Sequence, residues 1–207
     1  MNLPPRRALY VALEGIDGVG KSTAQREIAR RLRARGARVR LRREPSDPEW
    51  GRCAQRASSR DPWAAAVYFT IDRFLAAPRL RHDLGRADVV LTDRSFWSTI
   101  AYQGSALPPP DRRRLERLQR TATETPDLVL WLDLPATAGG RRLRARGGPP
   151  APLERRRVQA RVARAYRSLR HRPGWFRLDA SEAPGEVAGR AVDRIWARLP
   201  PRASARA

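Results

Sequence analysis

The sequence predicts an α/β fold in which helices cover both faces of a parallel β-sheet. Short, continuous apolar segments alternate with longer amphipathic segments along the chain. Strands buried on both faces have this apolar character, and their alternation with helices is typical of parallel sheets. Conspicuous charged residues, among them Asp17, Glu44 and Asp93, directly follow the predicted strands. Ligands of such folds bind beyond the carboxyl ends of the strands, so we expect the functional site at that edge.

The first part of the chain contains three predicted strands. A strand over residues 9–13 leads into a glycine-rich loop, and a helix over 22–35 follows, ended by Gly36. A weaker strand covers 37–41, and a third strand covers 88–92. These elements predict the first half of a parallel sheet.

A long helix is predicted between the second and third strands. Asp61 and Pro62 form a good N-cap and first-position pair for a helix that runs to residue 84. Gly85 should end it, and Pro78 should disturb it, because proline removes a helical hydrogen bond.

The second half of the chain continues the alternation of strands and helices. The predicted elements are a strand over 127–132, a helix over 135–146, a basic helix over 154–170, a strand over 176–178 and a helix over 185–199. Residues 147–152, Gly-Gly-Pro-Pro-Ala-Pro, are the clearest helix breaker in the chain. This segment should therefore separate the helix over 135–146 from the basic helix over 154–170.

Length and composition limit the class of protein. The 207 residues fit one domain over residues 1–200, with an expected disordered tail over 201–207. Cys53 is the only cysteine, and there are only two histidines, so no disulfide framework or zinc cluster can form. The start of the chain lacks the pattern of a signal peptide, and no apolar run approaches membrane-spanning length. We therefore expect a cytoplasmic protein without membrane contact.

The net charge of +22 comes from 43 Lys and Arg residues against 21 Asp and Glu residues. The arginines are spread along most of the chain, so solvated helix faces that attract phosphorylated substrates explain them better than a specific nucleic-acid partner. Only one basic residue, Lys21, is a lysine. Its position should require a compact ammonium that a planar guanidinium cannot imitate.

Residues 15–22 match the phosphate-binding pattern G-x-x-x-x-G-K-[ST] at every required position. Glycines let main-chain N–H groups turn toward a triphosphate, and Lys21 would reach the β- and γ-phosphates of ATP. A buried strand before the loop and a helix after it favour this interpretation over an ordinary glycine turn. The predicted nucleotide-binding residues are Gly15, Ile16, Asp17, Gly18, Val19, Gly20, Lys21, Ser22 and Thr23. The complete prediction is a three-layer sandwich of the P-loop kinase type, with a five-stranded parallel sheet.

Two acidic residues compete for a magnesium site next to Ser22. The Ser22 hydroxyl would supply one ligand, and Mg²⁺ usually takes a second from an acidic residue at the end of a neighbouring strand. Asp93 and Asp133 both follow predicted strands. We favour Asp93, because Arg94 beside it could hold an acceptor phosphate near the same metal. Asp133 would then be a helix cap or a loop stabiliser.

Six motifs, in order along the chain, resemble those of thymidylate kinases. They are residues 13–23, Arg43-Glu44-Pro45, residues 69–73, Asp93-Arg94 with residues 98–104, residues 126–133 and residues 178–181. The resemblance covers residues 9–199 and implies that the chain phosphorylates dTMP with ATP and Mg²⁺. It also implies a homodimer, and it places residues 179–181 beside the adenine of ATP.

The resemblance assigns base recognition to a helix. Phe69 and Arg73 are four residues apart, so they project from one helix face. Phe69 would stack on thymine, and Arg73 would donate to a base carbonyl, which disfavours the amino group of cytosine. The alternative is that Phe69 belongs to the apolar core, because Trp63, Val67 and Tyr68 lie nearby.

The resemblance assigns the rest of the acceptor to five polar residues. Gln103 would face the base, Tyr102 the sugar, and Arg94 with Arg43 the phosphate, which suits bidentate guanidinium geometry. Asp17 would lie near the 3′-hydroxyl of the sugar. The catalytic residues implied are Lys21, Asp17, Arg94 and Asp93.

The resemblance also implies a lid, over residues 144–157, and this segment departs from the family pattern. Residues 147–152 stand in place of the usual Asp-Arg pair, and residues 46–51 replace the usual glycines after Arg-Glu-Pro. Thymidylate kinases that lack an arginine in the phosphate loop supply one from the lid. The candidates are Arg144, Arg146, Arg155, Arg156 and Arg157. The sequence does not single out one of them, and residues 154–157 could equally be a solvated helix start.

Three functions are compatible with the sequence. The first is a dTMP kinase, the second is a kinase of a deoxynucleoside or modified nucleotide on the same fold, and the third is a nucleotide-binding regulatory module without enzymatic activity. The presence of Lys21, Ser22, Asp93 and Arg94 disfavours the third.

Overall fold

The computed structural model describes residues 7–58, 60–147 and 151–199. Within these residues, five parallel strands form one sheet in the order β2-β3-β1-β4-β5. The strands are β1 (Leu9–Glu14), β2 (Val39–Arg43), β3 (Val89–Asp93), β4 (Leu128–Asp133) and β5 (Trp175–Asp179). The predicted α/β fold with a five-stranded parallel sheet is therefore confirmed.

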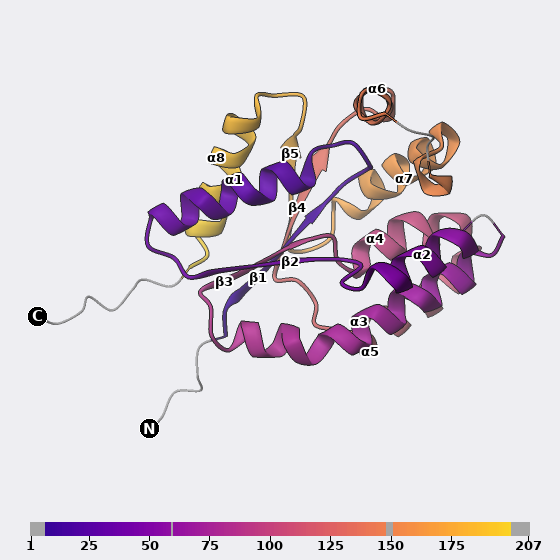
Figure 1. Ribbon diagram of the computed structural model, residues 1–207, viewed down its shortest axis with the longest axis horizontal. Helices are drawn as coiled ribbons and strands as arrows, with labels where there is room; N and C mark the ends of the chain where they lie inside the picture. Colours follow the sequence, from indigo (N-terminus) through magenta and orange to yellow (C-terminus); the bar gives the residue numbers. More distant parts are fainter. Residues whose placement is uncertain (1–6, 59, 148–150, 200–207) are drawn as a thin grey trace, which may run out of the picture.

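Helices lie on both sides of this sheet (Figure 1). α1 (Lys21–Ala34) and α8 (Pro184–Trp196) lie on one side, and α3 (Pro62–Leu84) with α5 (Pro109–Ala122) lies on the other. The remaining elements gather to the right of the sheet in Figure 1 and are α2 (Pro48–Ala57), α4 (Phe96–Tyr102), α6 (Ala136–Ala145), α7 (Arg156–Leu169) and the short 3₁₀ turns η1 (Gly104–Ala106) and η2 (Pro152–Glu154). None of the helices in the described part of the chain is both long and apolar enough to cross a membrane.

The central strand β1 is buried on both faces, which explains its continuous apolar sequence. Val11 and Leu13 pack in the main core with Leu32 of α1, whereas Tyr10 points to the other side and packs against Leu84 of α3. All of these side chains are at most 2% exposed. The loop that follows β1 is thus connected to a strand that is packed on both faces.

Strand and helix boundaries differ from the predicted ones by one or two residues in most cases. The clearest shift is β2, which starts at Val39 because Ala37 still belongs to the turn that closes α1: its N–H donates to the carbonyl of Leu32 at 3.0 Å. α3 begins and ends as predicted, with Asp61 capping it and Gly85 following it. The helix continues through Pro78, so the disturbance expected there does not interrupt it.

Three helices were not predicted from the sequence pattern, namely α2, α4 and α5. α2 is capped by Asp47, whose carboxylate accepts a hydrogen bond from the N–H of Glu49 at 2.7 Å. α5 starts inside the proline run 108–110. The predicted tail over 201–207 and residues 148–150 of the predicted lid lie outside the described residues.

Candidate active site

The phosphate loop connects the end of β1 to the start of α1. Gly15 and Gly18 have φ values of 146° and 76°, which residues with side chains rarely adopt. A Cβ at Gly18 would lie 2.5 Å from the carbonyl oxygen of Gly139 on α6, and a Cβ at Gly15 would lie 2.6 Å from that of Leu132 on β4. The loop therefore requires glycine both for its backbone conformation and for its close contact with neighbouring elements.

Lys21 is the first residue of α1 and is only 7% exposed. Its Nζ donates hydrogen bonds to the carbonyl oxygens of Gly15 at 3.0 Å and Ile16 at 2.8 Å. Burial, and after it the charge of Arg94, lowers the pKa of Lys21 to about 8. The ammonium thus donates only to neutral carbonyl oxygens of the loop. The phosphates of a bound nucleotide would give it negatively charged acceptors instead.

The structure distinguishes the two candidates for a metal-binding carboxylate. The Ser22 hydroxyl donates a hydrogen bond to Oδ2 of Asp93 at 2.6 Å, so the two oxygens lie side by side at the loop. Asp133 instead accepts a hydrogen bond from Nε of Arg177 at 2.7 Å. Hydroxyl and carboxylate oxygens are the donors that Mg²⁺ prefers. The pair Ser22 and Asp93 therefore fits a magnesium ion, and Asp133 is engaged elsewhere.

Asp17 connects the phosphate loop to the end of β3. Its carboxylate accepts hydrogen bonds from Nη2 of Arg94, from the Tyr102 hydroxyl at 3.0 Å and from the Gln159 amide at 2.8 Å. Burial raises the pKa of Asp17, but the charges of Arg94 and Lys21 outweigh burial, and the pKa lies below its ordinary value. The carboxylate is therefore ionised at neutral pH, in a loop that is built for phosphates.

The partner of Asp17 has an unusual backbone. Arg94 has a φ of 74°, in the left-handed region that residues other than glycine rarely adopt. Its N–H donates to the carbonyl of Leu13 at 3.0 Å, and its own carbonyl accepts a hydrogen bond from the Thr92 hydroxyl at 2.8 Å. Its guanidinium also donates to the Ser98 hydroxyl at 3.0 Å. These contacts hold a strained turn that directs the guanidinium toward the phosphate loop.

A cavity of about 530 Å³ opens beside Asp17 and Arg94. Its walls come from the loop after β2, from α2, α3 and α4, and from the η2 turn. All six residues predicted to bind the acceptor line it: Arg43, Phe69, Arg73, Arg94, Tyr102 and Gln103. Its size is typical of a site for a small molecule. The structure therefore brings the predicted acceptor residues together at the end of the phosphate loop.

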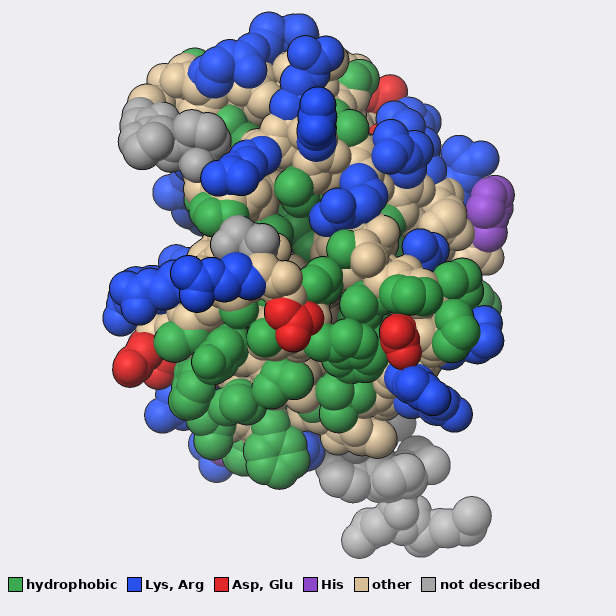
Figure 2. Space-filling view, turned by 90° about the vertical axis from the view of Figure 1, so that its right-hand side faces the viewer, with side chains coloured by type: hydrophobic (Ala, Val, Ile, Leu, Met, Phe, Trp, Pro, Cys, Tyr) green, Lys and Arg blue, Asp and Glu red, His purple; other side chains and the backbone are tan. Residues whose placement is uncertain are grey.

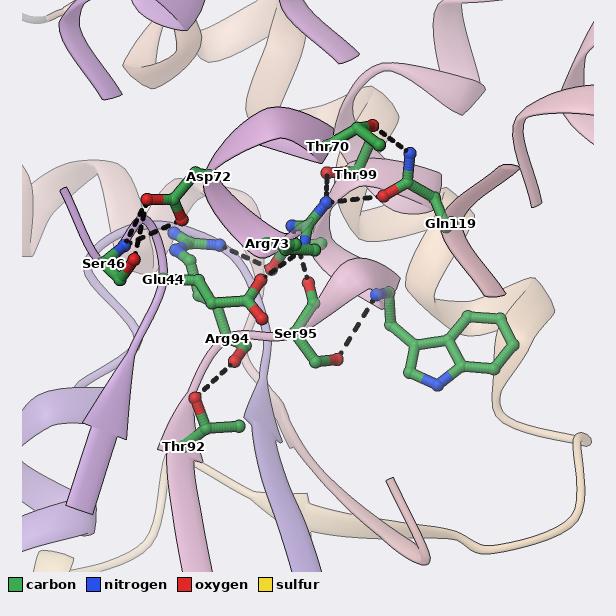
Figure 3. A network of polar contacts seen from close by, with 12 residues as sticks. Glu44, Ser46, Thr70, Asp72, Arg73, Thr92, Arg94, Ser95, Thr99 and Gln119 are labelled. Carbon is green, nitrogen blue, oxygen red and sulfur yellow. Dashed lines mark hydrogen bonds and ion pairs between the residues drawn. The ribbon is translucent and has the colours of Figure 1, made fainter. Parts of the chain in front are cut away.

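Arg73 lines this cavity and lies at the centre of a buried polar network (Figure 3). Its Nε donates to Glu44 at 2.6 Å, and its Nη1 donates to Thr99 at 2.8 Å and to Gln119 at 2.7 Å. Its Nη2 donates to the carbonyl of Ser95 at 3.2 Å. A guanidinium has five N–H donors, so among the described residues one N–H of Nη2 has no partner and remains for a ligand.

The cavity also contains unpaired amide oxygens. The Oε1 atoms of Gln103 and Gln55 are buried and have no hydrogen-bond partner among the described residues. Phe69 lines the same cavity and is half-buried, so it is not enclosed in the core. A cavity lined by an aromatic ring, an arginine and two amide oxygens without partners among the described residues suits a base with polar edges.

Arg43 lies at the end of β2, and its side chain is exposed. It lines the cavity, and no hydrogen bond or ion pair within the described part of the chain involves its guanidinium. Arg94 approaches the same cavity from the end of β3. Two guanidinium groups at one end of the cavity can neutralise a phosphate dianion.

Comparison with known proteins agrees with this geometry. The family model for thymidylate kinase matches residues 13–190 of the chain. The thymidylate kinase of Xanthomonas euvesicatoria pv. vesicatoria (strain 85-10) is 38% identical over 205 residues, which cover 95% of the chain and 87% of that protein. The thymidylate kinase of Synechococcus sp. (strain WH7803) is 35% identical over 193 residues, 86% of the chain and 90% of that protein. The chain belongs to the thymidylate kinase family.

In this member of the thymidylate kinase family, arginines surround a cavity of about 470 Å³ between α6 and α7. Arg144, Arg155 and Arg156 line it, and Arg146, which also lines it, is paired with Glu154 at 2.5 Å. Arg157 is exposed on α7. Figure 2 shows Lys and Arg side chains gathered in the upper part of this face, where α6 and α7 lie. The predicted lid segment is therefore rich in cations that could reach phosphates.

This thymidylate kinase family member contains functional candidates that the sequence did not reveal. Glu14 is fully buried and accepts hydrogen bonds from Ser95, Ser98 and Tyr166, so it ties the start of the phosphate loop to α4 and α7. A charged residue at the end of an apolar run is a signal by which Glu14 could have been found from the sequence. Gln55 belongs to the unpredicted helix α2, and Gln119 to α5. Nothing in the local sequence of Gln119 indicates its contact with Arg73.

Proposed function

We propose that this chain transfers the γ-phosphate of ATP to dTMP and so produces dTDP and ADP. Membership of the thymidylate kinase family supports this function. The single structural observation behind it is the ion pair of Asp17 and Arg94, which joins a phosphate loop to a cavity of nucleotide size. A donor site and an acceptor site that share residues are the requirement for direct phosphoryl transfer.

The donor would lie in the phosphate loop. Main-chain amides of residues 15–22 and the start of α1 would bind the phosphates of ATP, and Lys21 would move from loop carbonyls to phosphate oxygens. Ser22 and Asp93 would hold Mg²⁺. When bound, the ion would supply positive charge that offsets the negative charge of the phosphates. Residues 179–181 would lie at the adenine, near Arg142, which donates to the carbonyls of Val19 and Ala180.

The acceptor would lie in the cavity of about 530 Å³. Phe69 would stack on thymine, and the remaining N–H of Arg73 would donate to a base carbonyl. Gln103 would accept a hydrogen bond from the base, since its amide oxygen has no partner among the described residues. At the other end of the cavity, Arg94 and Arg43 would bind the phosphate, with Tyr102 and Asp17 next to the sugar.

Phosphoryl transfer requires little covalent chemistry from the protein. The residues would hold two anionic nucleotides in line and neutralise charge on the group in transit. Lys21 and Arg94 would do this from the phosphate loop and the end of β3, and an arginine of the lid over residues 144–157 would complete the site on closure. Arg144, Arg155 and Arg156 are the best placed, because they line the cavity between α6 and α7.

The proposal includes a homodimer and a cytoplasmic location. α3 presents an exposed apolar stripe of Val67, Phe74 and Leu75, which are 44%, 67% and 60% exposed. Figure 2 shows hydrophobic side chains over a broad lower area, where α2, α3 and α5 lie in Figure 1. An apolar area of this kind is typical of a surface that a second copy covers.

A panel of acceptors tests the function. ADP release would be measured with Mg²⁺ and ATP in the presence of dTMP, dUMP, dCMP, dGMP or thymidine. We expect the highest kcat/KM for dTMP. Turnover of thymidine but not of dTMP would favour a deoxynucleoside kinase, and no turnover with any acceptor would favour a regulatory module.

A further inference from the structure

Gln159 on α7 is 2% exposed and uses every polar atom of its side chain. Its Oε1 accepts a hydrogen bond from the main-chain N–H of Asp17 at 2.9 Å. Its Nε2 donates to Oδ2 of Asp17 at 2.8 Å and to the carbonyl oxygen of Leu153 at 2.6 Å. A primary amide has two N–H donors and one carbonyl acceptor. A longer contact of 3.5 Å joins Nε2 to the Tyr102 hydroxyl. Gln159 therefore holds Asp17 by both its backbone and its side chain.

The two closest partners of Gln159, Asp17 and Leu153, belong to different functional segments. Asp17 is part of the phosphate loop and lines the acceptor cavity. Leu153 belongs to the η2 turn within the predicted lid, and it lines the same cavity. Gln159 also lines the arginine-rich cavity between α6 and α7. One amide thus lies at the junction of the phosphate loop, the lid turn and the acceptor cavity.

We propose that Gln159 is a positioning residue that aligns Asp17 with the acceptor nucleotide and couples this alignment to the lid turn at Leu153. This inference rests on the proposed function, in which Asp17 lies at the 3′-hydroxyl of dTMP. Without Gln159, the carboxylate of Asp17 keeps Arg94 and Tyr102 but loses one of its hydrogen bonds. Its main-chain N–H also loses its partner, so the loop can rotate the carboxylate away from the sugar.

The side chain must be an amide for this role. A glutamate at this position would place a second carboxylate beside Asp17 and could not donate to the carbonyl of Leu153. A methionine would fill a similar volume but supply no hydrogen bond. The variants Gln159→Met and Gln159→Glu therefore separate loss of the contacts from active repulsion.

The first test needs no turnover. Hydrogen exchange at the main-chain amide of Asp17 would be measured in the free protein, with Gln25→Met as the matched control. Gln25 is also a buried glutamine, but its side chain donates to the carbonyls of Arg42 and Leu91, which lie outside the phosphate loop. We expect exchange at Asp17 to become about tenfold faster in Gln159→Met and to stay unchanged in Gln25→Met. Unchanged exchange in Gln159→Met would overturn the proposal.

The second test separates positioning from a merely structural effect. kcat/KM would be measured for dTMP and for its 3′-deoxy analogue, 3′-deoxythymidine monophosphate. If Gln159 acts through Asp17, Gln159→Met should lower kcat/KM for dTMP about tenfold and leave the value for the analogue nearly unchanged. Gln159→Glu should lower kcat/KM for dTMP more than Gln159→Met does.

Equal losses for the two nucleotides would contradict the positioning role. A kcat/KM for dTMP in Gln159→Glu equal to that of wild type would also contradict the positioning role. Failure of the wild-type protein to phosphorylate dTMP would instead contradict the proposed function, and the exchange measurement at Asp17 would still decide whether Gln159 holds the loop.

Discussion

Lys21 differs from every other basic residue of the chain in identity and in surroundings. It is the only lysine, it is buried, and it donates to two carbonyl oxygens of the loop around it. An ammonium can turn its three donors from carbonyls to phosphate oxygens without the planar geometry that a guanidinium requires. The chemistry of Lys21 therefore leads to one prediction about turnover and one about the pH dependence of ATP affinity.

Replacement of Lys21 should abolish turnover while the fold remains intact. Lys21→Ala removes the charge over the β- and γ-phosphates, and Lys21→Arg supplies a group too broad for the closed loop. We expect kcat to fall at least about 100-fold in both variants. Steady-state kinetics would measure this, with circular dichroism to confirm folding. Residual activity above about a tenth of wild type would contradict the assignment of the phosphate loop.

ATP affinity should fall as the pH rises above about 8. Burial lowers the pKa of Lys21 from 10.5 to about 8 in the free protein, whereas bound phosphates favour the charged form. Above about pH 8 the free protein must therefore take up a proton to bind ATP. Calorimetric titration should show affinity about 20-fold weaker at about pH 9.5 than at about pH 7.5. Lys21→Met should lack this dependence, and an equal pH dependence in the variant would contradict the prediction.

Arg73 should contribute both to stability and to acceptor binding. Its removal leaves Glu44 without its cation in a place where burial already raises the pKa of that carboxyl. We expect Arg73→Ala to lower the free energy of unfolding by about 3–5 kcal/mol and to raise the KM for dTMP. Urea unfolding would measure the first effect. The double variant Arg73→Ala/Glu44→Gln should recover part of the stability but not the KM; recovery of both would place Arg73 outside the acceptor site.

At the scale of elements, α2 forms one wall of the acceptor cavity and depends on a close contact. A Cβ at Gly51 would lie 2.7 Å from Cγ of Pro45. Gly51→Ala should therefore push α2 away from the loop after β2 and move Gln55 with it. We expect the KM for dTMP to rise about 3–10-fold, with the KM for ATP unchanged.

Gly85→Ala is the matched control for this variant. Gly85 has a φ of −78°, and a Cβ there would make only ordinary contacts, at 3.6 Å or more. Its kinetics should match those of wild type. A normal KM for dTMP in Gly51→Ala would mean that α2 does not shape the acceptor site.

The elements that sequence could predict are those with local signals. The apolar runs, the phosphate-loop pattern and the Asp61-Pro62 cap each lie within a few residues, and the corresponding strands and helices are present. α2 has the same local signal in Asp47-Pro48, with Asp47 as its N-cap. Gln159 had no such signal, since its contact with Asp17 joins residues 142 apart in sequence. Only the folded sheet brings them together.

At the scale of the whole molecule, the apolar stripe on α3 predicts association. Phe74 is the most exposed large apolar side chain in the described part of the chain, at 67%, and Leu75 follows at 60%. Phe74→Glu should place a charge in the proposed interface and convert a dimer to a monomer. Sedimentation velocity at micromolar concentration would measure this. A monomeric wild-type protein would contradict the homodimer.

The central claim is that one molecule joins a donor site to an acceptor site, so that phosphate passes directly between two nucleotides. The most direct measurement follows both products by anion-exchange chromatography after incubation with Mg²⁺, ATP and dTMP. The account predicts equal amounts of dTDP and ADP, with negligible ADP when dTMP is omitted. ADP formation that does not depend on dTMP, or that occurs without dTDP, would contradict it.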